Sequence, residues 1–224
     1  MIQTVSSGTR LRRRSEAERL PVVVLNFGSV RVTDTAAVGR VAETIVSEHA
    51  RGVNVVAVLP AYGHALDELS RLASAVSASP HPRELDMLVS SGAAMATALC
   101  TMAVQGRGCR AVSLEGSQAG IVTNAAHTRA EVVEVRTSRI EAELRRHGIV
   151  LLSGVQGIAR ETGEPTILAP GGHDVAALAL ARALGADVCV VVSGTVNGTL
   201  TVATRMLADG ALCSSEFDAS LREG

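Results

Sequence analysis

The stretch GGHDVAALALARALGADVCVVVS (residues 171–193) decides the fold class of this chain. Two glycines precede a segment in which Ala and Leu recur with helical period, and another glycine separates that segment from a continuous apolar run. Paired glycines at a helix N-terminus commonly present backbone N–H groups to an anion. We therefore predict a glycine turn, a helix and a buried strand, with a site for a small molecule where the helix begins.

The same alternation of apolar strands and amphipathic helices extends along the chain. Apolar runs predict strands that are buried on both faces, at residues 21–26, 53–59, 110–114, 148–153 and 187–193. Apolar residues at helical spacing predict helices between them, at residues 35–50, 65–78, 85–104, 139–147 and 173–186. This pattern predicts an α/β fold, a three-layer α/β/α sandwich with a mainly parallel sheet. Ligands of such folds bind beyond the carboxyl ends of the strands.

Length and composition favour one domain with a sizeable core. The chain has 224 residues, of which 47% are hydrophobic and 1% aromatic. We expect residues 1–20 to form a disordered, arginine-containing arm and residues 21–224 to form a single domain. The scarcity of aromatic side chains argues against base stacking, so we expect no nucleic-acid partner. The first twenty residues lack the apolar core of a signal peptide, and we expect a cytoplasmic protein that binds no membrane.

All 21 basic residues are arginine, and none is lysine. Chemistry that needs a compact lysine charge or a Schiff base therefore has no donor in this chain. The four cysteines have neither CxxC nor zinc-type spacing. We expect them to be buried free thiols in a reducing compartment, and we expect no metal site.

Three segments resemble the aspartokinase branch of the amino-acid kinase family. RELDMLVSSGAA (83–94) is similar to the family's R-E-x-D-M-L-x-x-x-G-E, and GSQAGIVTNAAH (116–127) to its G-S-Q-A-G-I/V-x-T-x-x-x-H. GGHDVAALALARALGADVC (171–189) is similar to its G-G-S-D-T-T-A-x-x-L-A-x-x-L-x-A-D-x-C. The match is collinear from about Pro21 to Arg205. It implies the family's eight-stranded, mainly parallel sheet between helices and its reaction, transfer of the ATP γ-phosphoryl group to a carboxylate. Against the family's pattern, we expect this chain to lack the C-terminal part of the catalytic domain and the regulatory domains.

The family's charged positions are changed in this chain. Asn26 stands at the lysine of the family's K-F-G-G-T-S loop, Ala93 at its substrate-binding glutamate and Pro170 at its substrate-binding arginine. In the family, the lysine neutralises the phosphoryl group during its transfer, and such charge compensation is a dominant catalytic contribution. We therefore expect a pseudokinase-like homologue that has lost aspartate phosphorylation. We also expect that Mg-ATP does not bind in the family's manner, while any other cofactor stays open.

Two histidines and an aspartate are the candidate catalytic residues. His173 stands at the family's substrate-contacting serine, Asp174 at an aspartate of its catalytic centre, and His64 follows the second predicted strand. Histidine transfers protons near neutral pH. Asp174 has an alternative role as a helix cap. The candidate substrate-binding residues are Asn26, Gly28, Ser29, Tyr62, Ser117, Gln118, Gly171 and Gly172, and the candidate anion contacts are Arg31 and Arg205.

Three functions are compatible with this pattern. We favour an enzyme that acts on another small molecule in the old substrate cleft. The alternatives are an ATP-dependent kinase of a different carboxylate or amino acid, and a non-catalytic partner subunit. The segment from Arg83 to Val104 is amphipathic and rich in Ala and Met, and in the family this region lies near subunit contacts. We therefore expect a homodimer.

Overall fold

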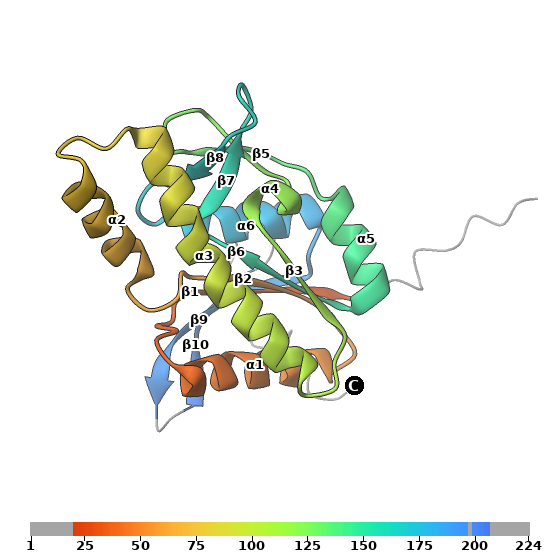
Figure 1. Ribbon diagram of the computed structural model, residues 1–224. Coiled ribbons are helices and arrows are strands. Elements are labelled where there is room, and N and C mark those ends of the chain that lie inside the picture. The colour runs from red at the N-terminus through yellow and green to blue at the C-terminus, as the bar shows by residue number, and fades with distance from the viewer. Residues whose placement is uncertain (1–19, 197–198, 207–224) are drawn as a thin grey trace, which may run out of the picture.

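A six-stranded sheet forms the centre of the molecule (Figure 1). The computed structural model describes residues 20–196 and 199–206, and their side chains as far as residue 192. The sheet has the order β10-β9-β1-β2-β6-β3. These strands are β1 (Val22–Ser29), β2 (Asn54–Leu59), β3 (Ala111–Leu114), β6 (Ile149–Ser153), β9 (Val188–Val196) and β10 (Thr199–Met206). All neighbours are parallel except β10, which is antiparallel to β9. The five predicted strands are therefore confirmed, and the predicted arm lies outside the described residues apart from Leu20.

A second, smaller sheet was not expected from the sequence. It has the order β5-β4-β7-β8 and consists of β4 (Ile121–Thr123), β5 (Val132–Val135), β7 (Gln156–Ala159) and β8 (Pro165–Ile167). Its strands have only three or four residues, and each includes a polar residue, glycine or proline (IVT, VVEV, QGIA and PTI), so none gives a recognisable apolar run. The single eight-stranded sheet implied by the resemblance is thus replaced, in the described residues, by sheets of six and four strands.

Helices cover both faces of the larger sheet, as the three-layer prediction requires. The helices are α1 (Thr35–His49), α2 (Ala65–Val76), α3 (Pro82–Gln105), α4 (Gly116–Ala119), α5 (Ser138–His147) and α6 (Gly172–Leu184). Alternate residues of the strands point to opposite faces. Val23 and Leu25 share one core with α1 and α3, whereas Val22 and Val24 share the other with α5 and α6.

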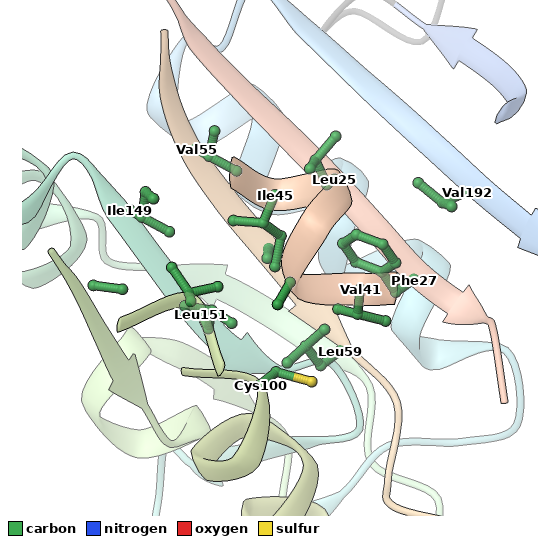
Figure 2. Close-up of a cluster of buried hydrophobic side chains, with 14 of the residues drawn as sticks. Leu25, Phe27, Val41, Ile45, Val55, Leu59, Cys100, Ile149, Leu151 and Val192 are labelled. Carbon is green, nitrogen blue, oxygen red and sulfur yellow. The ribbon is translucent and has the colours of Figure 1, made fainter. Parts of the chain in front are cut away.

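The first of these cores is packed with fully buried aliphatic side chains (Figure 2). Phe27 and Leu151 from the sheet lie with Ile45 of α1 and Cys100 of α3, each 0% exposed. Burial raises the pKa of the Cys100 thiol to about 12 and is the main cause that raises the pKa of Cys189 to about 11. These two cysteines are the buried free thiols expected from the sequence. Cys109 is only half-buried, and Cys213 lies outside the described residues.

Helix α3 has the length and apolar composition of a membrane span, the one such helix among the described residues. It is nevertheless part of the folded domain, because it packs against α1, α2 and β8 and contributes Cys100 and Val104 to the first core. Core helices of this kind also satisfy a length-and-hydropathy criterion. The hydropathy of α3 is therefore explained by its buried face.

Residues 171–193 form the turn, helix and strand predicted for them. Gly171 adopts φ +80° at the N-cap of α6, and Gly185 adopts φ +56° at its C-cap. Both angles lie in the left-handed region that glycine adopts without steric cost. These two glycines fix where α6 begins and ends. Its first turn consequently lies at the carboxyl end of β1, against which α6 packs.

Two leucine truncations test the position of the core. Leu151→Ala should lower the free energy of unfolding by about 2–5 kcal/mol, because Leu151 is 0% exposed and its truncation leaves a cavity in the central sheet. The same change at Leu72, which is 54% exposed on α2, should stay within about 0.5 kcal/mol. Urea denaturation of both variants measures the difference. Equal losses would contradict this assignment of the core.

Candidate active site at the carboxyl edge of the sheet

His173 lies where the carboxyl ends of β1 and β6 meet the first turn of α6. A Cβ atom on Gly28, near the end of β1, would lie only 1.7 Å from the His173 Cδ2 atom. A Cβ atom on Gly154, just after β6, would lie 3.3 Å from the His173 Cβ atom. The imidazole thus lies against Gly28 at the place where any other residue would have its Cβ atom.

Asp174 is bound to the central strand through Asn26. The Asn26 Nδ2 atom donates to Asp174 Oδ1 at 2.6 Å, and the Gly28 N–H group donates to Asn26 Oδ1 at 2.9 Å. Asn26 is 1% exposed, whereas the Asp174 side chain is 58% exposed. One end of this hydrogen-bonded chain is therefore fixed in the core, and the other reaches the surface.

The structure brings the side chains of His173 and Asp174 together, which their adjacency in the chain does not guarantee. The His173 Nε2 atom lies 3.4 Å from Asp174 Oδ1, and the His173 side chain is 24% exposed. The alternative role of Asp174 as a helix cap is not found, because Gly171 occupies the N-cap position and no side chain caps the helix. Asp174 still lies in the first turn, where the helix dipole favours a carboxylate.

Asn26 lies behind Asp174, and its predicted contact with substrate remains a prediction. Its amide is buried, and both polar ends are engaged within the protein by Gly28 and Asp174. In this geometry Asn26 acts on a ligand only through Asp174. The sequence could not reveal this, because Asn26 and Asp174 are 148 positions apart.

The ion-pair partner of His64 is Asp67, and not His173 or Asp174. It is exposed at the N-cap position of α2, makes no side-chain cap, and pairs through Nδ1 with Asp67 Oδ2 at 3.9 Å. Tyr62 is half-buried against the first core, and its backbone pairs with Val32. The loops after β1 and β2 therefore run side by side, but the structure gives His64 no contact with His173.

The remaining predicted residues lie in loops, at the ends of helices and strands, and in β10. Gln118 forms a capping box with Glu115 at α4, and Ser117 beside it is exposed. Ser29 and Arg31 are exposed after β1. Gly171 and Gly172 begin α6, and a Cβ atom on Gly172 would press on Leu168. The Arg205 backbone lies in β10 opposite Val190, and its side chain lies outside the description. Ligand contacts by these residues remain predictions.

A second polar cluster joins α3 to the smaller sheet. Asp86, 1% exposed, accepts hydrogen bonds from the Thr128 N–H group and pairs with His127 Nδ1 at 2.8 Å. Glu164 lies 3.8 Å from His127 Nε2 and accepts a hydrogen bond from Arg83 Nε at 2.5 Å. The segments that resemble the family contain Arg83, Asp86 and His127 but give no sign that these residues meet. The burial of Asp86 makes this a structural anchor, in agreement with a structural role for His127.

The His173–Asp174 pair supplies two side chains of metal-ligating type. Within residues 20–192, no three or more His, Cys, Asp or Glu side chains are arranged to hold a metal ion. A protein site for a catalytic metal commonly supplies three ligands. What the pair can do by itself is accept, donate and relay a proton.

Replacement of Gly28 by alanine tests the contact with His173. Gly28→Ala should lower the free energy of unfolding by about 1–3 kcal/mol, because the new methyl group overlaps the imidazole. Adding His173→Ala should recover part of this loss, since the overlapping ring is then absent. Gly39→Ala is the matched control, because its Cβ atom would meet Arg107 Nη2 at an ordinary 3.5 Å. Chemical denaturation measures all three, and additive losses at Gly28 and His173 would refute the contact.

Comparison with known proteins identifies the family of this chain. The model of the amino acid kinase family matches residues 21–201. The aspartokinase of Mycobacterium tuberculosis is 41% identical over 172 residues, which cover 77% of this chain and 41% of the relative. That of Corynebacterium glutamicum is 39% identical over 188 residues, which cover 84% of this chain and 44% of the relative. The chain thus spans less than half the length of these curated relatives.

Solved structures share the fold. Aspartate kinase from Synechocystis superposes with a TM-score of 0.63 at 34% identity, covering 76% of this chain and 27% of that one. Carbamate kinase from Giardia lamblia, solved with AMP-PNP, superposes with a TM-score of 0.57 at 14% identity, covering 81% of this chain and 73% of that one. The second likeness concerns the fold alone. On the match of residues 21–201 and the identity to the curated aspartokinases, this chain belongs to the amino-acid kinase family, as an aspartokinase-like member.

Proposed function

We propose that this aspartokinase-like domain has lost ATP-dependent phosphorylation of aspartate. In its place, the domain acts on another small molecule at the same edge of the sheet, with His173 and Asp174 as the proton-transferring pair. The observation that carries the proposal is the hydrogen bond of 2.6 Å from Asn26 to Asp174, made at the position where the family has a lysine. The proposed proton transfer rests on the imidazole beside that carboxylate.

A buried amide cannot replace the lysine in phosphoryl transfer. Asn26 donates a hydrogen bond but carries no charge, and a cation at the transferred phosphoryl group commonly contributes several orders of magnitude to the rate. Its amide donates to Asp174, accepts from Gly28 and is only 1% exposed. No part of Asn26 is therefore available to an incoming phosphate.

The glycine loop after β1 is also poorly suited to hold a phosphate. A phosphate cradle needs free backbone N–H groups and open space above the glycines. Here the Gly28 N–H group is bonded to Asn26, and the His173 imidazole lies on the Cα face of Gly28. The loop keeps Gly28, but the protein itself occupies both the N–H group of this glycine and the space beside it.

His173 and Asp174 have the arrangement of an acid–base pair. The imidazole is partly exposed and lies 3.4 Å from the carboxylate, close enough for Asp174 to favour one orientation of the ring. We propose that this pair transfers a proton to or from a small metabolite in a cytoplasmic protein. His64, exposed in the loop after β2, is proposed as a second histidine at the mouth of the site.

Nucleotide binding and phosphoryl transfer test the first half of the proposal. Titration calorimetry with Mg-ATP at millimolar concentration should give no binding heat, and Mg-ATP with aspartate should release no ADP. The full-length aspartokinase of Corynebacterium glutamicum is the positive control for both assays. Saturable Mg-ATP binding to this chain would favour an ATP-dependent kinase of another carboxylate or amino acid. Release of ADP with aspartate would overturn the proposed loss.

Ligand binding tests the role of the histidine. A thermal-shift screen of small metabolites, together with native mass spectrometry of the purified chain, should identify a ligand that raises the melting temperature. His173→Ala should weaken its binding at least about tenfold, the effect of losing one hydrogen bond to a charged group. His81→Ala is the control, because His81 is exposed and makes no side-chain cap at α3. Equal affinity of wild type and His173→Ala would contradict the role of His173.

We further propose that the chain is a homodimer that pairs through the exposed side of α3. Four large apolar side chains of this helix are exposed, namely Met87 (45%), Met95 (47%), Leu99 (38%) and Met102 (62%). The last three follow the i, i+4, i+7 spacing of one helix face, and Figure 1 shows α3 crossing the surface beside α2. Exposed apolar patches of this kind often mark interfaces between proteins.

The oligomeric state tests this interface. Light scattering on the purified chain should give the mass of a dimer, and Leu99→Glu should convert it to a monomer by placing a charge in the apolar face. Val133→Glu is the control, because Val133 is equally apolar and 46% exposed on β5. A monomeric wild-type chain would refute the homodimer, and a dimer unaffected by Leu99→Glu would place the interface elsewhere.

A further inference from the structure

We propose that Asn26 is a positioning residue that holds the Asp174 carboxylate in a single orientation beside His173. The inference rests on the proposed function, in which Asp174 and His173 do the chemistry. It adds a residue that acts on the pair only through its hydrogen bond to Asp174. The inference is based on the hydrogen-bond donors and acceptors of Gly28, Asn26 and Asp174, which form one hydrogen-bonded cluster.

The direction of each hydrogen bond in the cluster is fixed by the Gly28 N–H group. A backbone N–H group only donates, so the atom of Asn26 that faces it must be the amide oxygen. The amide nitrogen then necessarily faces Asp174 Oδ1, at 2.6 Å. An NH₂ group only donates, so this Asp174 oxygen must accept. The arrangement therefore fixes Asp174 Oδ1 as the acceptor and Asn26 as the donor.

The backbone around Asn26 holds the amide in place. Asn26 lies in β1 between β2 and β9, opposite Val58 and Val191. The pairing of β1 with β9 shifts register between Asn26 and Ser29, and within this irregularity the Gly28 N–H group turns to the Asn26 side chain. Because Asn26 is only 1% exposed, its amide is confined by the packed strands.

The two carboxylate oxygens of Asp174 consequently have different roles. Oδ1 receives the Asn26 amide and lies 3.4 Å from His173 Nε2, so it orients the imidazole. The side chain as a whole is 58% exposed, which leaves Oδ2 for water or a ligand. An asparagine at position 26 thus orients the carboxylate without neutralising it, whereas a lysine would do both.

Exchanging the two side chains tests the direction of the bond. Asn26→Asp places two carboxylates about 2.6 Å apart, and we expect the urea midpoint at pH 7 to fall by about 1 M. At pH 5 the loss should shrink, because two adjacent carboxyls can share one proton in the folded state. Asp174→Asn should change the midpoint little, since its amide can present oxygen to Asn26. The double variant Asn26→Asp with Asp174→Asn should recover the midpoint, because residue 26 then accepts from both Gly28 and residue 174.

Spectroscopy of His173 separates positioning from a purely structural role. In full-length chain with ¹⁵N-labelled histidine, the His173 ring signals are assigned by their absence in His173→Ala. Asn26→Leu removes both hydrogen bonds and releases Asp174, so the His173 Nε2 signal should shift. Asn124→Leu is the control, because the Asn124 amide bonds Glu131 and not Asp174. An unchanged His173 signal in Asn26→Leu would overturn the positioning role, even if stability falls.

Failure of this inference is distinguishable from failure of the proposed function. No recovery in the double variant, or a loss in Asn26→Asp that does not shrink at pH 5, overturns the assignment of donor and acceptor. Should Asn26→Asp fail to fold, the double variant is compared with Asp174→Asn, and a lower midpoint in the double variant likewise overturns that assignment. Saturable Mg-ATP binding by the wild-type chain would instead refute the proposed function while leaving the geometry of Asn26 intact.

Discussion

The close approach of helix α6 to the ends of β1 and β6 is the constraint on which the site depends. Gly28 and Gly154 have no side chain, so the first turn of the helix can lie against the sheet with His173 between them. The left-handed Gly171 sets the point at which the helix begins. A Cβ atom at position 28 would overlap the His173 imidazole, and one at position 154 would press on Val58 and lie 3.3 Å from the His173 Cβ atom.

The large elements of the fold could be predicted because their periodicity is local. The five buried strands each show a continuous apolar run, and the five amphipathic helices show a period of 3.6 residues. The four-stranded sheet escaped prediction because β4 and β8 have only three residues each. Its stability comes instead from contacts such as the buried Thr123–Thr166 hydroxyl pair, which joins residues 43 positions apart.

The site was predictable to the extent that its residues are adjacent in the chain. His173 and Asp174 are adjacent in the segment that resembles the family's G-G-S-D, so the sequence alone places both at the start of one helix. The partnership of Asp174 with Asn26 depends on how α6 packs on β1, which no local pattern encodes. For the same reason His64 was grouped with His173 from strand order alone, whereas its side chain pairs with Asp67 within its own helix. Proximity at a sheet edge is set by topology, and contact is set by side-chain direction.

The close contact between Gly28 and His173 also limits which substitutions these two positions can accept. The two positions share one small volume, so residue 28 can grow only after residue 173 has shrunk. A lysine regained at position 26 would meet the same carboxylate but would still find the imidazole over the glycine loop. The close contact therefore fixes the order in which positions 28 and 173 can change, because a larger residue 28 fits only beside a smaller residue 173.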